Sequence, residues 1–357
     1  MADRIAPRDD IAMMDGYHSP QVSVDVRLNT NESPLPPPQA FLDAVAVQVA
    51  ATEWHRYPDR QATELRRRLA AVHGVGSGQV FVANGSNEVL QTLSLTYGGP
   101  GRSIAVFEPT YAMHSQIARV AGSTVAEGAR GADLALDLDE VRRVVAEARP
   151  AITYLCSPNN PTGMVESAET VTEVLDLVEG IGGLLVVDEA YGQFAPWSAL
   201  ELLSEDRSLV VTRTYSKTWS MAAARLGYLL GPSWVVAELE KVVLPYHLDA
   251  LKQAAGTIAL DFVDDMERRV SILTEERGRV DAALRELPLE VWPSAANFIL
   301  FRPTTADAND VWQQLVDRSV LVRNCSGWPG LTGCLRVTIG TTDEDDRFLT
   351  ALREVLS

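Results

Sequence analysis

The stretch SLVVTRTYSKTWSMAAARLGYLLG, residues 208–231, places two apolar, β-branched runs on either side of a polar loop. The runs, 208–215 and 225–231, have the composition of strands that are buried on both faces of a sheet. The loop contains Lys217, and only three of the chain's 31 lysines and arginines are lysines, the others being Lys241 and Lys252. Two interpretations are open: a solvated surface charge, or a position that needs an amine of lowered pKa, which arginine cannot supply.

Runs of the same kind precede this stretch and alternate with helical patterns. They span 79–83, 103–107, 151–156 and 183–189. Such alternation is typical of a mostly parallel sheet that is covered by helices, so we predict an α/β fold with a mixed, mostly parallel sheet. Apolar periodicity predicts helices over 39–50 and 62–74, the second of which ends at Gly74.

The last third of the chain has a different pattern, typical of a smaller α+β domain. Residues 253–287 predict one long amphipathic helical region. Strands are predicted over 297–302, 320–323 and 334–340, and helices over 307–317 and 343–356. We therefore expect three parts: an N-terminal arm over 1–35 that packs with the small domain or a partner subunit, a large domain over 36–248, and a small domain over 249–357.

Composition argues against several classes of protein. The 357 residues carry a net charge of −17, so we expect no nucleic-acid partner and no binding to an acidic membrane. The longest apolar runs, such as 184–187, are too short to span a membrane, and residues 1–17 lack the apolar core of a signal peptide. The spacing of the three cysteines fits no zinc pattern and indicates a reducing compartment. We expect a cytoplasmic protein without a metal site.

Polar residues follow each predicted strand, at the sheet edge where α/β proteins bind ligands. After 79–83, Gly85 and Ser86 lead into a helix, whose first amides attract anions, although an ordinary helix cap is an equal alternative. Tyr111 follows 103–107 and could stack on a flat ligand, although a core aromatic is the simpler interpretation. After 151–156, two prolines bracket Asn159 and Asn160, which favours a presented amide over a simple turn.

The two remaining strand ends carry charge. Asp188 ends an apolar run, where a carboxylate is costly unless a cation or several donors meet it, with helix capping as the alternative. Lys217 follows Ser216, and Arg225 lies eight residues further on. Together the loops offer an anion cradle, an aromatic ring, an amide, a carboxylate and an amine. These groups match the needs of pyridoxal 5′-phosphate, whose aldehyde takes a lysine and whose ring nitrogen takes an aspartate.

The same loops resemble those of the fold-type-I pyridoxal-phosphate aminotransferases and, within them, the histidinol-phosphate aminotransferases. The resemblance covers nearly the whole chain. It rests on these motifs: YHSPQ (17–21), RLNTNESPLPPP (27–38), RYPD (56–59), NGSNE (84–88), EPTYAMH (108–114), SPNNPTG (157–163), VDEAYGQF (187–194), RTYSK (213–217), RLGY (225–228), ANFILFR (296–302), VLVR (320–323) and LRVTIGT (335–341). The lysine loop and SPNNPTG are the most specific of them.

The resemblance implies a role for each candidate site residue. Lys217 would bind the cofactor aldehyde and move the proton during catalysis, and Asp188 would pair with the ring nitrogen. Tyr191 and Asn160 would bond the ring hydroxyl oxygen, and Tyr111 would stack on the ring. The cofactor phosphate would be held by Ser86, Asn87, Ser216 and Arg225.

Substrate and partner contacts are implied in the same way. Arg336 would bind the α-carboxylate of glutamate and, with Arg323 and Tyr17, would face the phosphate of histidinol phosphate, with Asn160 nearby. Guanidinium groups suit both anions, because carboxylate and phosphate accept paired hydrogen bonds. Tyr57 would reach the phosphate of the partner subunit's cofactor, which implies a homodimer with shared sites.

The implied reaction is amino transfer between histidinol phosphate or imidazole acetol phosphate and 2-oxoglutarate or glutamate, in histidine biosynthesis. An aromatic amino acid aminotransferase and a threonine-phosphate decarboxylase would share the cofactor residues and stay open as alternatives. A non-catalytic binding protein would have lost Lys217 or Asp188, and both are present. One departure is Asn87, where many relatives carry aspartate, and another is the small-residue segment SMAAA in the lysine loop.

Overall fold

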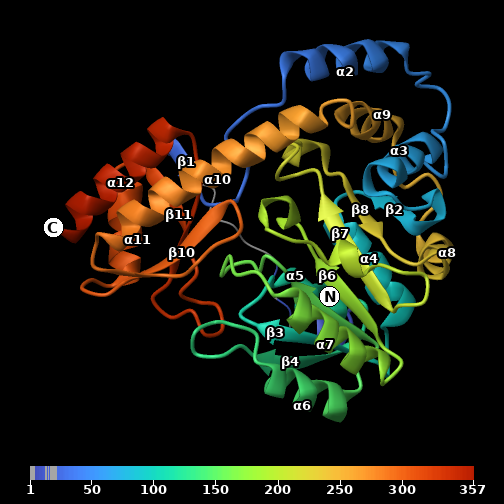
Figure 1. Cartoon of the computed structure of the whole chain (residues 1–357), viewed down its shortest axis with the longest axis horizontal. Helices are drawn as coiled ribbons and strands as arrows, with labels where there is room; N and C mark the ends of the chain where they lie inside the picture. Colours follow the sequence, from blue (N-terminus) through green and yellow to red (C-terminus); the bar gives the residue numbers. More distant parts are fainter. Residues whose placement is uncertain (1–4, 13, 15, 17–21) are drawn as a thin grey trace.

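The computed structural model describes residues 5–12, 14, 16 and 22–357, and it arranges them around two sheets (Figure 1). Tyr17 lies outside the described residues. A short helix, α1 (Asp9–Ala12), precedes the first strand, β1 (Val26–Leu28). Among the described residues, no helix is both long enough and apolar enough to cross a membrane.

The larger sheet has seven strands in the order β2-β8-β7-β6-β5-β3-β4. Among its described strands, β8 pairs antiparallel to both β2 and β7 and all other pairs are parallel, which confirms the predicted mixed, mostly parallel sheet. The strands are β2 (Val80–Ala83), β3 (Ser103–Glu108), β4 (Thr124–Ala129), β5 (Ile152–Cys156), β6 (Leu184–Asp188), β7 (Leu209–Thr214) and β8 (Gly227–Leu230).

Helices cover both faces of this sheet because its strands bury side chains on both sides. On β3, Ile104 and Val106 pack in one cluster, whereas Ala105 and Phe107 pack in another. The first face carries α4 (Ser86–Tyr97), α5 (Met113–Val120) and α8 (Ser233–Val242). The second face carries α6 (Leu138–Ala148), at the bottom of Figure 1, and α7 (Ala168–Glu179). Continuous apolar runs are the expected sequence signature of such strands.

A third cluster covers the β2–β8 end of the sheet. It contains residues of α2 (Gln39–Ala51), α3 (Thr63–His73) and α9 (Ala250–Ala259). The predicted stop of the second helix is confirmed, since α3 ends at a left-handed Gly74 with φ +67°. Short 3₁₀ turns complete this part of the chain: η1 (Ser77–Gln79), η2 (Gly192–Phe194), η3 (Ala199–Leu202) and η4 (Ala222–Ala224).

The smaller sheet has five strands in the order β1-β11-β12-β10-β9. It comprises β1, β9 (Leu289–Val291), β10 (Phe298–Pro303), β11 (Val320–Asn324) and β12 (Leu335–Thr338). Strand β1, which lies in the predicted N-terminal arm, pairs parallel to β11. The sheet packs against α10 (Val263–Arg285), α11 (Ala308–Asp317) and α12 (Thr342–Leu356).

The helical region predicted over 253–287 is divided between two helices, α9 and α10. The chain turns between them at 260–262, where Leu260 joins the cluster of α2 and α3 and Asp261 pairs with Arg68 at 2.6 Å. This break depends on tertiary packing, since the turn contains neither glycine nor proline.

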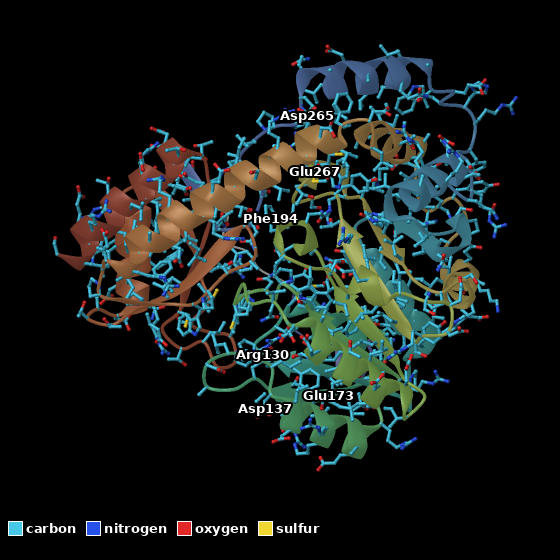
Figure 2. All side chains as sticks on the ribbon, viewed as in Figure 1. Arg130, Asp137, Glu173, Phe194, Asp265 and Glu267 are labelled. Carbon is cyan, nitrogen blue, oxygen red and sulfur yellow. The ribbon has the colours of Figure 1, made fainter. Side chains whose placement is uncertain are left out.

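Helix α10 connects the two parts of the molecule. Met266, near its start, packs in the cluster of α2, α3 and α9, whereas Leu273 and Leu284 pack against the smaller sheet. Phe194, which lies beneath α10 in Figure 2, also joins the cluster of the smaller sheet although it follows β6. The division at residue 248 stays a prediction, and the packing of α9 favours a boundary closer to the start of α10.

Candidate active site

A cavity of about 190 Å³ opens where the two sheets meet, at the carboxyl ends of β5, β6 and β7. All predicted site residues within the described part of the chain except Tyr57 line it, namely Ser86, Asn87, Tyr111, Asn160, Asp188, Tyr191, Ser216, Lys217, Arg225, Arg323 and Arg336. The arm contributes the segment 29–31. Tyr57 lies elsewhere, with 80% of its surface exposed.

Lys217 follows β7 and points its amine toward the arm, where Nζ donates a hydrogen bond to the backbone oxygen of Thr30 at 3.1 Å. Desolvation in the cavity, followed by the positive charges of Arg336 and Arg225, lowers the pKa of Lys217 to about 7, although Glu32 acts in the opposite direction. A substantial fraction of this amine is therefore neutral near neutral pH. A neutral amine can attack an aldehyde, whereas an ordinary surface lysine is almost fully protonated.

Asp188 is buried at the end of β6 and has three hydrogen-bonding neighbours. Oδ1 accepts from Thr212 Oγ1 at 3.0 Å and from the backbone nitrogen of Ala190 at 3.2 Å, and Oδ2 lies 3.1 Å from His114 Nε2. A carboxylate only accepts, so the proton of this contact belongs to His114. His114 is itself fixed, because its ring stacks on Tyr154 with centroids 4.7 Å apart. The carboxylate is thus held in one orientation at the cavity.

The anion cradle forms at the start of α4. Gly85 precedes the helix with φ +86°, and a Cβ atom there would lie 2.9 Å from Arg225 Nη2. A Cβ atom on Gly227 would collide with the backbone nitrogen of Ser86. Arg225 Nη1 donates to Ser216 Oγ at 3.2 Å. The helix N-terminus, a guanidinium and a hydroxyl therefore converge at one end of the cavity, as a phosphate group requires.

Aromatic and amide groups also line the cavity. Tyr111 donates from its hydroxyl to Asn87 Oδ1 at 3.1 Å, and its ring meets His114 edge-on. Asn87 thus serves as an acceptor for the ring that is expected to stack on the cofactor. An aspartate at this position could accept the same hydrogen bond, so the departure at Asn87 preserves this contact.

Tyr191 and Asn160 extend the polar lining toward the smaller sheet. Burial raises the pKa of Tyr191 to about 12, and its hydroxyl accepts a hydrogen bond from Asn31 Nδ2 at 2.9 Å. Asn160 Oδ1 accepts from Arg336 Nη1, and Arg336 Nη2 donates to the backbone oxygen of Asn29 at 3.0 Å. These contacts join the two sheets and the arm across the cavity.

Arg336 is a buried cation that lines the cavity. Only 5% of its surface is exposed, and among the described residues no carboxylate forms a salt bridge with it. Other buried arginines, such as Arg130 and Arg213, do have one, in Glu166 at 2.7 Å and in Glu189 at 2.7 Å. A buried charge is costly unless it is paired, so the Arg336 guanidinium is suited to an anionic ligand.

Several neighbours of the cavity were not predicted as functional. His114 and Thr212 orient Asp188, Asn31 bonds Tyr191, and Trp328 lines the cavity, where Arg323 lies over its ring at 5.6 Å. His114 ends the EPTYAMH motif and Asn31 lies in RLNTNESP, so both stood in quoted motifs. Nothing in the sequence around Trp328 connects it with Arg323.

Comparison with known proteins places the chain in a family. The model of aminotransferase classes I and II matches residues 23–352. The chain belongs to the class I and II aminotransferase family. Within it, histidinol-phosphate aminotransferase of Frankia casuarinae is 45% identical to this aminotransferase, over 100% of this chain and 91% of the relative. The enzyme of the same name from Mycolicibacterium smegmatis is 43% identical, over 98% and 93%.

A solved structure agrees with the fold of the aminotransferase. Histidinol-phosphate aminotransferase from Sinorhizobium meliloti, in complex with pyridoxal-5′-phosphate, matches with a TM-score of 0.90 over 99% of this chain and 98% of that chain. The two sequences are 23% identical, so this likeness shows a shared fold. The predicted fold type is thereby confirmed.

Proposed function

We propose that this aminotransferase transfers the amino group of L-histidinol phosphate to 2-oxoglutarate, forming imidazole acetol phosphate and glutamate in histidine biosynthesis, with pyridoxal 5′-phosphate as cofactor. The observation that carries the proposal is the pair of Arg323 and Arg336, which face the same cavity as Lys217. Identity of 43–45% over the whole chain to histidinol-phosphate aminotransferases supports it. The reaction is reversible.

The residues fit the cofactor at each of its polar ends. When bound, pyridoxal 5′-phosphate supplies an aldehyde carbon that takes up an amino group and a ring that withdraws electrons. The start of α4, with Ser86, Asn87, Ser216 and Arg225, would hold the phosphate. Asp188 would keep the ring nitrogen protonated, because its charge is fixed there by Thr212 and His114.

Lys217 would supply both the bond to the aldehyde and the proton transfer. Its amine, with a pKa lowered to about 7, can release a proton to bind and can accept one during turnover. Tyr191 and Asn160 would donate to the ring hydroxyl oxygen, and Tyr111 would stack on the ring, which excludes water from one face.

Arg336 would alternate between two anions. In one half of the reaction it would bind the α-carboxylate of glutamate, and in the other it would bind the phosphate of histidinol phosphate together with Arg323. Both anions accept paired hydrogen bonds from a guanidinium, so one pocket can serve both substrates. Tyr17 would add a contact to the phosphate.

We also propose a homodimer in which Tyr57 reaches the cofactor phosphate of the partner subunit. Tyr57 is exposed and stacks on Tyr246 with ring centroids 4.5 Å apart. Exposed apolar side chains lie along the same segments, including Val47, Trp54 and Leu244. Apolar groups of this size on a surface favour a protein interface. The three free cysteines support a cytoplasmic location, since that compartment is reducing.

The direct test is a comparison of amino donors with 2-oxoglutarate as acceptor. We expect kcat/KM for histidinol phosphate to exceed that for phenylalanine by about 100-fold or more, because only histidinol phosphate carries a phosphate group that both arginines can bind. A preference for phenylalanine would instead identify an aromatic amino acid aminotransferase. Release of carbon dioxide from threonine phosphate would identify a decarboxylase. Sedimentation analysis of the purified protein tests the dimer.

A further inference from the structure

Lys252 connects α9 with the loop that begins the anion cradle. Its Nζ donates to Asn84 Oδ1 at 2.7 Å and lies 2.9 Å from Asp249 Oδ2. The side chain is 26% exposed, so most of its length is packed. Lys241 offers a contrast, since its side chain is 66% exposed and pairs with Glu238 one helical turn away.

Asn84 links Lys252 to several groups at the start of α4. Its Nδ2 donates to Glu88 Oε2 at 2.8 Å and to the backbone oxygen of His247 at 2.9 Å, and its backbone nitrogen also donates to Glu88 Oε2. Gly85 and Ser86 lie between the two residues that this network joins. The side-chain oxygen and nitrogen of Asn84 are therefore both engaged, and the oxygen is bonded to Lys252.

The cradle leaves little room for its backbone to move. Gly85 and Gly227 approach Arg225 and Ser86 so closely that neither position has space for a Cβ atom. A small shift of 84–86 would displace the first amides of α4 from the point where they converge with Arg225. Hydrogen bonds that hold Asn84 thus also hold the cradle.

The same network also holds an acidic side chain in the first turn of α4. Glu88 lies in the first turn of α4, and a carboxylate there opposes the binding of a second anion at the start of the helix. Two N–H groups of Asn84 donate to the Glu88 carboxylate, and the ammonium of Lys252 is bonded to the side-chain oxygen of the same asparagine.

We propose that Lys252 is a positioning residue for the cofactor phosphate, which acts through Asn84 on the N-terminal amides of α4. The inference rests on the cofactor of the proposed function, but it does not depend on which substrates the enzyme takes. It gives two of the three lysines of the chain a place at the two ends of one cofactor: Lys217 at the aldehyde and Lys252 behind the phosphate.

The test compares pyridoxal 5′-phosphate with pyridoxal, which lacks the phosphate, as ligands of the cofactor-free protein. Dissociation constants are measured by absorbance and by quenching of tryptophan fluorescence for the unaltered protein, Lys252→Met and the control Lys241→Met. We expect Lys252→Met to weaken binding of pyridoxal 5′-phosphate by about tenfold and binding of pyridoxal by less than about twofold. Lys241→Met should change neither constant, and Lys252→Arg should recover most of the loss.

The two ligands separate positioning from general damage. Equal losses for both ligands in Lys252→Met, or unchanged binding of pyridoxal 5′-phosphate, would overturn the inference. Circular dichroism and the melting temperature of each variant identify one that does not fold, in which case Lys252→Gln replaces Lys252→Met. Failure of the unaltered protein to bind pyridoxal 5′-phosphate would overturn the cofactor assignment itself, which is a different outcome.

Discussion

Arg323 on β11 and Arg336 on β12 are directly opposite each other in the antiparallel ladder, and both line the cavity that contains Lys217. Like charges directly opposite in a sheet are destabilising unless an anion lies between them. We therefore expect an anion to bind at this end of the cavity, in line with the proposed function. The first two predictions concern this end.

Replacing Arg336 should affect both halves of the reaction. In Arg336→Met, kcat/KM should fall by about 100-fold or more for glutamate and for histidinol phosphate. The reason is that the carboxylate of one substrate and the phosphate of the other both lose their contact with a buried guanidinium. Single-turnover measurement of each half-reaction checks this. The matched control is Arg347→Met, an exposed arginine that pairs with Asp25 and should leave both rates unchanged. Loss in one half alone would contradict the shared role.

Replacing Trp328 should change KM for histidinol phosphate more than KM for glutamate. Its ring packs on the Arg323 guanidinium, and a cation–π contact of this kind contributes about 0.5–2 kcal/mol. Trp328→Ala should raise KM for histidinol phosphate by about three- to tenfold, with a change of less than about twofold for glutamate. Trp328→Phe, which retains a ring, should behave almost as the unaltered enzyme. Equal changes for both substrates would place Trp328 outside phosphate recognition.

Asp188→Asn should retain the cofactor and lose most of the activity. The amide keeps the shape of the carboxylate but not its charge, so the ring nitrogen would no longer be held protonated. We expect kcat to fall by about 100-fold or more, in line with the loss of a group that controls proton transfer. A spectrum of the bound cofactor confirms occupancy. Near-normal turnover would rule out this role for Asp188.

Lys217→Met should abolish amino transfer and stabilise the cofactor-free protein. The pKa of Lys217 is lowered from 10.5 to about 7, so between these values the unfolded chain binds more protons than the folded one. The stability of the unaltered protein should therefore rise with pH from about 7 toward 10.5, as the contribution of this group recovers.

In Lys217→Met, the side chain at position 217 does not titrate, so it makes no pH-dependent contribution to stability. The difference in melting temperature between the two cofactor-free proteins should be a few degrees at pH 7 and should shrink by pH 10. Thermal denaturation followed by circular dichroism measures it, and Lys241→Met provides a control at an exposed position. A difference that grows with pH would contradict a desolvated amine.

The sequence predicts a strand correctly where the residues next to one another in the chain are all buried in the same sheet. Runs such as 184–187 are buried on both faces of the larger sheet, so their composition alone identifies them as strands. The edge strand β4 was missed, because most of its residues are partly or fully exposed and TVAEGA lacks the apolar character of its neighbours.

Candidate site residues follow the same division. Asp188 and Lys217 end parallel strands, where the topology places ligands, and the sequence pointed to both. The contact of Asn31 with Tyr191 joins residues 160 positions apart, and that of Trp328 with Arg323 depends on the conformation of a loop. Tertiary structure determines such contacts, so periodicity and composition carry no signal of them.

The two ends of the cavity are lined by residues from two sheets, each of which packs in its own hydrophobic core. Asp188 ends a strand of the larger sheet and Lys217 follows another, whereas Arg323 and Arg336 lie on strands of the smaller one. Mutations that alter which substrate is bound can therefore accumulate on the smaller sheet, while the residues of the larger sheet continue to catalyse the same reaction. Such a separation makes the scaffold easy to diversify in evolution, since a new substrate requires no new chemistry.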